Sequence, residues 1–175
     1  MLAARDTWYK TTVKQNKIKS LSLHNTYEVP DNVLESWDAT ELNNGKVMAY
    51  LLDDYSLHLV GNGEGKIYAN PDSSYAFSDE LDAGAQYVYP YGYLSTIENF
   101  DMFDTSYVTD MYKMFQYFGG YNNGSIDLSF VNNMDTSNVT NMSYMFFSAG
   151  DEAKHTASID ISKWNTSNVT NMSSM

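Results

Sequence analysis

The sequence predicts an α/β fold in which short strand–turn–helix repeats stack into a solenoid, behind an N-terminal antiparallel β-rich capping region. Three observations lead to this prediction. An eight-residue phrase begins at residues 104, 135 and 165, so it recurs after 31 and then 30 residues. Apolar residues with helical spacing follow each phrase, and a short alternating run precedes the second and third phrases. One such unit cannot bury its own apolar face, but stacked units can.

The helix of each repeat is predicted from the spacing of its apolar side chains. In the second copy they stand at offsets of 0, 3, 6 and 7 residues, at Val139, Met142, Met145 and Phe146. Such offsets place side chains on one face of a helix. A hydroxyl of Thr140 or Ser137 is expected to cap the first turn. Methionine-rich faces can also be adaptable binding grooves, but repetition in register favours packing in the core.

The strand of each repeat is predicted from the runs "SIDLSF" (residues 125–130) and "SIDISKW" (158–164), which alternate apolar and polar residues. The first position of the phrase is Asp104, Asp135 or Asn165 in the three copies. Because both side chains accept hydrogen bonds in Asx turns, we expect a structural acceptor at this position. A ladder of metal-binding carboxylates would have less reason to tolerate the amide.

Residues 1–93 contain no repeat and are expected to form the capping region. Four strand-like runs alternate there with turn-forming residues, at 18–23, 46–52, 55–60 and 66–70. The expected product is a small antiparallel sheet that covers the first repeat, since repeat arrays need capped ends. Residues 94–175 then hold the three copies, of which the last is incomplete.

The repeats resemble those of the BspA-like leucine-rich-repeat surface proteins of bacteria. The resemblance rests on "FDTSYVTDMYKMF", "MDTSNVTNMSYMF" and "WNTSNVTNMSSM", at residues 103–115, 134–146 and 164–175. It implies a leucine-rich-repeat-like solenoid that is exported or attached to the cell surface and acts in adhesion or other protein interactions. No catalytic residue is associated with this repeat, so none is carried over. The repeats here are longer than the family pattern, and the chain shows no leader or anchor.

Charge and composition argue against several function classes. The net charge of −12 and the pI of about 4.3 oppose binding to nucleic acids and to anionic membranes. The chain has no cysteine and no apolar run long enough to cross a membrane as a helix. His24, His58 and His155 are isolated from one another in the sequence and belong to no metal or catalytic motif. We therefore expect no enzyme, no metal site and no cofactor.

The loops beside the repeats are the predicted binding rim. Segments rich in Tyr, Gly and Asn, at residues 87–93 and 116–124, combine the residues that binding loops favour, because tyrosine buries much area with few rotatable bonds. The candidate ligand-binding residues are Tyr87, Tyr89, Tyr91, Tyr93, Tyr117 and Tyr121. The alternative is that these rings pack against the capping region or neighbouring repeats.

Together these features predict a non-enzymatic protein-interaction or adhesion module of a surface or secreted protein, with a protein or glycoprotein as its ligand. The alternative is a structural or receptor-binding segment of a larger assembly, such as a cell-wall protein or a virion appendage. The expected location is extracellular or at the cell surface. Because the last copy reaches Met175 with its apolar face uncovered, we also expect further repeats or another chain to cover that end.

Overall fold

The computed structural model describes residues 1–5, 7–11, 18–78, 94–120, 124–151, 153–156 and 159–175, and within them the fold is mainly β. The strands are β1 Ser20–His24, β2 Val33–Asp38, β3 Val47–Leu52, β4 Ser56–Gly61, β5 Ile67–Tyr68, β6 Ile97–Glu98, β7 Phe103–Asp104, β8 Ser125–Ile126 and β9 His155–Thr156. Two short 3-10 helices accompany them, η2 Phe100–Met102 and η3 Ser129–Asn133.

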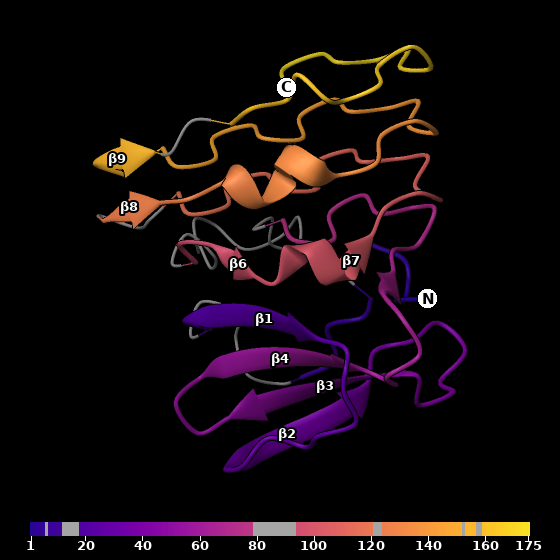
Figure 1. The fold of residues 1–175 in the computed structure, drawn as a ribbon. Coiled ribbons are helices and arrows are strands. Elements are labelled where there is room, and N and C mark those ends of the chain that lie inside the picture. The colour runs from indigo at the N-terminus through magenta and orange to yellow at the C-terminus, as the bar shows by residue number, and fades with distance from the viewer. Residues whose placement is uncertain (6, 12–17, 79–93, 121–123, 152, 157–158) are drawn as a thin grey trace, which may run out of the picture.

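A five-stranded sheet lies at one end of the molecule, with the strand order β2-β3-β4-β1-β6 (Figure 1). β2, β3 and β4 pair antiparallel in sequence order, whereas β1 lies parallel to both β4 and β6. Alternation along β4 buries Leu57 and Leu59 and turns His58 to the other face, as a half-buried strand requires. The sheet is therefore mixed, and the predicted purely antiparallel arrangement is wrong at β1.

Beyond the sheet, successive segments of the chain lie one above another in sequence order, and the C-terminal end lies at the top of the view (Figure 1). β5 pairs with β7 and β8 pairs with β9, both in parallel. Isolated parallel bridges join Asp72 to Asp110, Asp110 to Asn141 and Asn141 to Asn171. Equivalent positions of successive copies are therefore direct neighbours.

The segments after these bridges, residues 72–78, 110–118 and 141–149, form what we call turn strips. In the second strip alternate N–H groups donate to carbonyls of the next copy at 2.9 to 3.1 Å: those of Met111, Lys113, Phe115 and Tyr117. The N–H groups between them donate within the strip. Met114 donates to the Met111 carbonyl at 3.1 Å and Gln116 to the Lys113 carbonyl at 3.2 Å. Half of the hydrogen bonds thus run within a copy and half run between copies.

The predicted α/β solenoid of strand–turn–helix repeats is wrong, because sheet dominates and the part of the chain that the structure describes has no α-helix. Left-handed backbone at Tyr144 (φ 58°) and Ser148 (φ 54°) interrupts the segment that was expected to be helical. The expected helix caps are absent as well. The Ser137 N–H donates to Asp135, and the Thr140 hydroxyl donates to the Thr109 carbonyl.

The predicted repeat strands are also shorter than expected. In the run at residues 125–130, only Ser125–Ile126 is a strand, and the chain then turns into η3. In the run at 158–164, the described residues 159–164 contain no strand. β9 lies before that run, at His155–Thr156.

The side chains of the turn strips build the part of the core that lies beyond the five-stranded sheet. The repeated methionines of the first two copies are 0% exposed, which confirms their predicted core role: Met111, Met114, Met142 and Met145. The equivalent Met172 of the third copy is 44% exposed. The rings of Phe77, Phe115 and Phe146 occupy equivalent positions and stack in nearly parallel planes, with neighbouring centroids 5.6 Å apart. Trp164 continues this column at 6.3 Å from Phe146.

Candidate binding surface

The polar residues of the repeated phrase hold the backbone of the turns. Asp135 Oδ1 accepts the N–H of Ser137 at 2.9 Å, and Asn165 Oδ1 accepts that of Ser167 at 3.1 Å. The predicted Asx-turn role is confirmed, since an acceptor oxygen is all that the position needs. Hydrogen bonds from the side chain and backbone of Ser137 hold the pKa of Asp135 below its usual value.

The threonine and asparagine side chains of the phrase bond one copy to the copy before it. Thr140 Oγ1 donates to the Thr109 carbonyl at 3.0 Å, and Thr170 Oγ1 donates to the Thr140 carbonyl at 3.1 Å. Asn138 Nδ2 donates to the Ser106 carbonyl at 2.8 Å. Because these side chains form their hydrogen bonds within the chain, we assign the repeated phrase a structural role.

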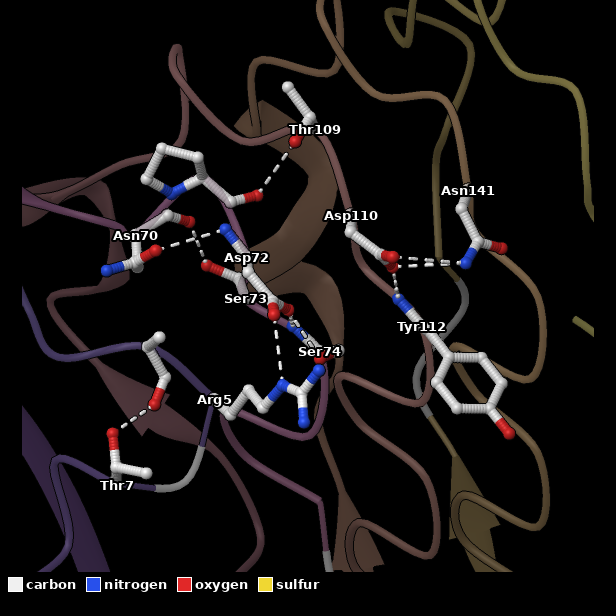
Figure 2. Close-up of polar contacts among 12 residues, drawn as sticks. Arg5, Thr7, Asn70, Asp72, Ser73, Ser74, Thr109, Asp110, Tyr112 and Asn141 are labelled. Atoms are coloured by element: carbon white, nitrogen blue, oxygen red, sulfur yellow. Dashed lines mark hydrogen bonds and ion pairs between the residues drawn. The ribbon is translucent and has the colours of Figure 1, made fainter.

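Residues 72–77, "DSSYAF", take the place of a copy before the first phrase, whereas three copies were predicted, the first of them beginning at residue 104. Asp72 Oδ1 accepts the Ser74 N–H at 3.2 Å, just as Asp110 Oδ1 accepts the Tyr112 N–H at 2.7 Å (Figure 2). The next copy joins this column when Asn141 Nδ2 donates to Asp110 Oδ1 at 3.1 Å. The sequence signal is an acid followed five residues later by Phe, at 72–77 and 110–115.

An exposed ion pair covers the outer end of this column. Arg5 Nε lies 2.9 Å from Asp72 Oδ2, and the two side chains are 59% and 40% exposed (Figure 2). Burial raises the pKa of Asp72, but hydrogen bonds from Ser74 and Arg5 outweigh it and hold that pKa below its usual value. Pairs this exposed contribute about 0–1 kcal/mol, so the interaction is not a major source of stability.

An equivalent position in each turn strip, and in the last copy, combines a left-handed backbone with a partly or fully exposed side chain. These positions are Tyr75 (φ 60°), Lys113 (φ 56°), Tyr144 (φ 58°) and Ser174 (φ 53°). Such angles are uncommon outside glycine. Backbone bonds between copies hold them in place, since Tyr75 N–H donates to the Tyr112 carbonyl at 3.0 Å.

Five aromatic rings form a continuous series across the three turn strips, which we call the aromatic row: Tyr75, Tyr112, Tyr144, Phe147 and Tyr117. Their successive centroids lie 5.3, 6.1, 5.6 and 6.0 Å apart, with ring planes tilted by 58° to 89°. Tilted and edge-to-face pairs at these distances are mutually stabilising. The tyrosines are half-buried and Phe147 is 39% exposed, so the row keeps an accessible surface.

A single lysine is seated among the first three rings of the row. Lys113 Nζ lies 5.4 Å from the Tyr75 centroid, 5.3 Å from that of Tyr112 and 5.9 Å from that of Tyr144. Cation–π attraction favours this placement of the ammonium group. The aromatic row therefore presents ring surface around a fixed positive charge, on a chain whose net charge is −12.

One of the six residues predicted to bind ligand, Tyr117, belongs to the aromatic row. The other five lie outside the residues that the structure describes: Tyr87, Tyr89, Tyr91, Tyr93 and Tyr121. Tyr75, Tyr112, Tyr144 and Phe147 were not predicted, because the prediction was confined to the loops between repeats. The tyrosines follow the first residue of each turn strip, an Asp or Asn, by two or three positions, and this recurrence is the signal that could have found them.

Two of the three histidines meet on the outer face of the five-stranded sheet. The β1–β4 register places Ser22 opposite His58, and His24 Nε2 lies 2.9 Å from His58 Nδ1. The expectation that the histidines are isolated from one another is wrong for this pair, while His155 lies far along the chain in β9. Over the described ranges, no three His, Cys, Asp or Glu side chains converge as a metal site would require.

An apolar pocket lies beside the sheet and the first turn strips. Its walls include Trp8, Ile18, Leu57, Phe77 and Phe118. Burial raises the pKa of the Tyr9 phenol, which also lines it. Two further lining residues, Ser78 and Leu94, border residues 79–93, which are outside the described part of the chain, so we assign no site to this pocket.

Comparison with known proteins finds one family. Residues 89–175 match the family model described as Mycoplasma protein of unknown function, DUF285. The DUF285 match, just under half of the chain, takes in all three copies of the phrase and every member of the aromatic row except Tyr75. No curated protein and no solved structure matches the chain. Among the described residues, no helix has the length and apolar character needed to cross a membrane.

Proposed function

We propose that the chain is a non-enzymatic protein-interaction module of a secreted or surface-attached protein, and that the aromatic row with Lys113 is its ligand-binding surface. The observation that supports this proposal is the row itself, five rings in contact across three turn strips. Aromatic side chains supply a large share of the binding energy at protein interfaces. The resemblance of the phrase to BspA-like repeats supports a role in adhesion.

The ligand of this proposal is a protein or glycoprotein with an extended segment. The row runs from one strip to the next, so it suits a segment laid along it. Apolar groups of the ligand contact the tilted rings, while an acidic group of the ligand pairs with Lys113. The rings are held by neighbouring copies before binding, which keeps the entropy cost of ordering them low.

The test is binding of the full 175-residue chain to a panel of purified extracellular-matrix proteins and mucin-type glycoproteins, measured by biolayer interferometry. The test variant carries Tyr117→Ser and Phe147→Ser, which remove two adjacent rings. The matched control is Tyr27→Ser, because Tyr27 is 74% exposed and lies away from the row, after β1. We expect at least one panel member to bind, and the double variant to bind it about tenfold or more weakly.

The control variant should bind like the native chain. A panel with no binder at micromolar concentration contradicts the proposed function. So does binding that survives loss of the two rings. A drop of many degrees in the melting temperature of the double variant would instead make these rings part of the core.

A further inference from the structure

The histidine pair on the sheet is built around one hydrogen-bonded contact. His24 Nε2 lies 2.9 Å from His58 Nδ1, whereas the ring centroids are 5.0 Å apart and the ring planes differ by 14°. Because the two nitrogens are much closer than the centroids, the rings meet edge to edge. At this distance one nitrogen carries a hydrogen and the other offers its lone pair. Ser22 Oγ lies 3.0 and 3.1 Å from the same two nitrogens.

A chain of hydrogen bonds fixes which ring donates. Asp54 Oδ1 accepts the Ser56 hydroxyl hydrogen at 2.6 Å, so Ser56 Oγ has only lone pairs left for His58 Nε2 at 3.2 Å. His58 Nε2 therefore carries a hydrogen. The neutral His58 ring has its lone pair on Nδ1, and His24 Nε2 is the donor to it.

We propose that His24 and His58 form an acid-sensitive latch between β1 and β4, which accepts one added proton with the rings in contact and opens when a second proton binds. The first proton goes to His24 Nδ1, away from the contact. The His24 imidazolium still donates through Nε2 to His58. The second proton can bind only at His58 Nδ1, whose lone pair the contact uses, so two N–H groups then face each other. The direct hydrogen bond between the rings is lost, and Ser22 Oγ is left as an acceptor within reach of both N–H groups.

The charged groups around the latch suit a single positive charge. Asp54 reaches His58 through Ser56, and Glu98 on β6 pairs in register with Ser22 on β1. Tyr50 on β3 is opposite His58, and Lys19, whose charge acts on Asp54, precedes β1.

The order of protonation agrees with these surroundings. Burial, followed by the charge of His24, lowers the pKa of His58, while Asp54 and Glu98 oppose that shift. His58 is therefore the ring that accepts its proton last.

Opening the latch weakens the pairing on which the sheet depends. β1 pairs with β4 over five residues and also with β6, the strand that leads toward the repeats. Because the folded pKa of His58 lies below its unfolded value, the stability from the neutral ring is fully present above about pH 6.5. That stability is lost as the pH falls through the pKa that His58 has in the folded chain. Histidine is the side chain that ordinarily titrates in this part of the pH scale.

The test is an NMR titration of the histidine side chains of the full chain between pH 8 and 5, with EDTA present. Nitrogen shifts at pH 8 should show His58 protonated at Nε2 and unprotonated at Nδ1. His24 and His58 should titrate as a coupled pair in two steps more than about one pH unit apart. In His24→Ala, His58 should titrate in one step at a higher pH, and His155→Ala should leave the pair unchanged.

Several results would overturn the latch. One is the opposite His58 tautomer at pH 8. Another is a set of three histidines that titrate independently with one common midpoint. A third is a His58 titration that does not respond to His24→Ala. The tautomer measurement needs no variant, so it decides the question even if a substituted chain folds poorly, and it does not depend on the proposed ligand surface.

Discussion

Thr105 ties two copies of the repeat together with one hydroxyl. It accepts the N–H of Asp135 at 2.9 Å and donates to the Asp135 carbonyl at 3.0 Å, and it is 2% exposed. The backbone N–H and carbonyl of Asp135 are thereby satisfied by a buried side chain from the preceding copy. Thr136 repeats the second bond, to the Asn165 carbonyl at 3.2 Å. In the first two copies, Thr at this position of the phrase therefore has a hydrogen-bonding role.

Replacing this hydroxyl by a methyl group should destabilise the fold although the shape is kept. Thr105→Val removes both hydrogen bonds to the backbone of Asp135, at a contact that is part-buried, which costs about 0.5–1.5 kcal/mol for each lost hydrogen bond. Thr105→Ser keeps the hydroxyl and serves as the matched control, with the smaller loss of one methyl group. The free energy of unfolding in urea measures both. Equal losses in the two variants would show that packing, and not hydrogen bonding, sets the role of Thr105.

The turn strips show why one element was predicted wrongly while its buried residues were predicted correctly. Met142 and Met145 stand three residues apart, a spacing that an α-helix and a strip of three-residue turns share. The sequence therefore indicates which side chains are buried but does not distinguish these backbones. The decision lies in hydrogen bonds between copies, such as Tyr144 N–H to the Ser173 carbonyl at 2.9 Å, which no pattern within one repeat contains.

The aromatic row was only partly predictable from the sequence, because its ring contacts also form between copies. Tyr117 was recognised by its Tyr- and Gly-rich surroundings. Tyr75 and Lys113 occupy one column only because residues 72–77 act as an additional copy, and that copy shares little more than its acid and its phenylalanine with the phrase. Neighbours in this column come from different copies, so their contact follows from the stacking and not from local spacing.

The junction between the second turn strip and β8 should be sterically tight. Gly119 has φ +66°, and a Cβ there would lie 2.7 Å from Ile126 Cγ2 and 3.2 Å from the Leu94 carbonyl oxygen. Gly45 has a similar φ of +70° with nothing within 4 Å of an added Cβ, so it is a matched control. Gly45→Ala should cost about 1–2 kcal/mol for the left-handed backbone alone. Gly119→Ala should cost about 1–3 kcal/mol more, because the clash is added.

Urea unfolding of the two glycine variants measures this difference. A similar loss in both variants would mean that Ile126 moves aside freely and that β8 is not packed tightly on the strip. A larger loss in Gly119→Ala would locate the strain at this junction, since the backbone conformation is the same in the pair.

At the scale of the whole molecule, the fold depends on pairings between segments far apart in the sequence. β1 and β4 were both predicted as strands, because the alternation of apolar and polar residues is sufficient to identify them. Their parallel pairing, which brings His24 to His58, could not be predicted, because hairpin signals report only on strands joined by short turns. β2 was also missed, although its Trp37 Nε1 donates to the Trp8 carbonyl at 2.7 Å and ties the N-terminal segment to the sheet.

The Asx turns spread along the molecule should make the whole fold sensitive to strong acid. Hydrogen bonds from the Ser two residues further on hold three pKa values below the usual range, those of Asp127, Asp135 and Asp160. Because the folded pKa is below the unfolded one, each carboxylate stabilises the fold above about pH 4. This stabilisation is lost as the pH falls through the folded values. Acidification also reduces the net charge of −12, which weakens the repulsion between carboxylates. This second effect stabilises the fold and so acts against the loss from the Asx turns.

Replacing all three aspartates by asparagine separates the two effects. Asn keeps the acceptor oxygen, as Asn165 does where it accepts the Ser167 N–H, but it does not titrate. The triple variant should therefore be less stable than the native chain at pH 7, by the stability that ionisation of the three carboxylates supplies, and should unfold less steeply below pH 4, as measured by thermal melts across the pH range. A triple variant that loses stability as steeply as the native chain in acid would assign acid unfolding to other carboxylates. A triple variant as stable as the native chain at pH 7 would mean that these turns need only the acceptor oxygen and not the charge.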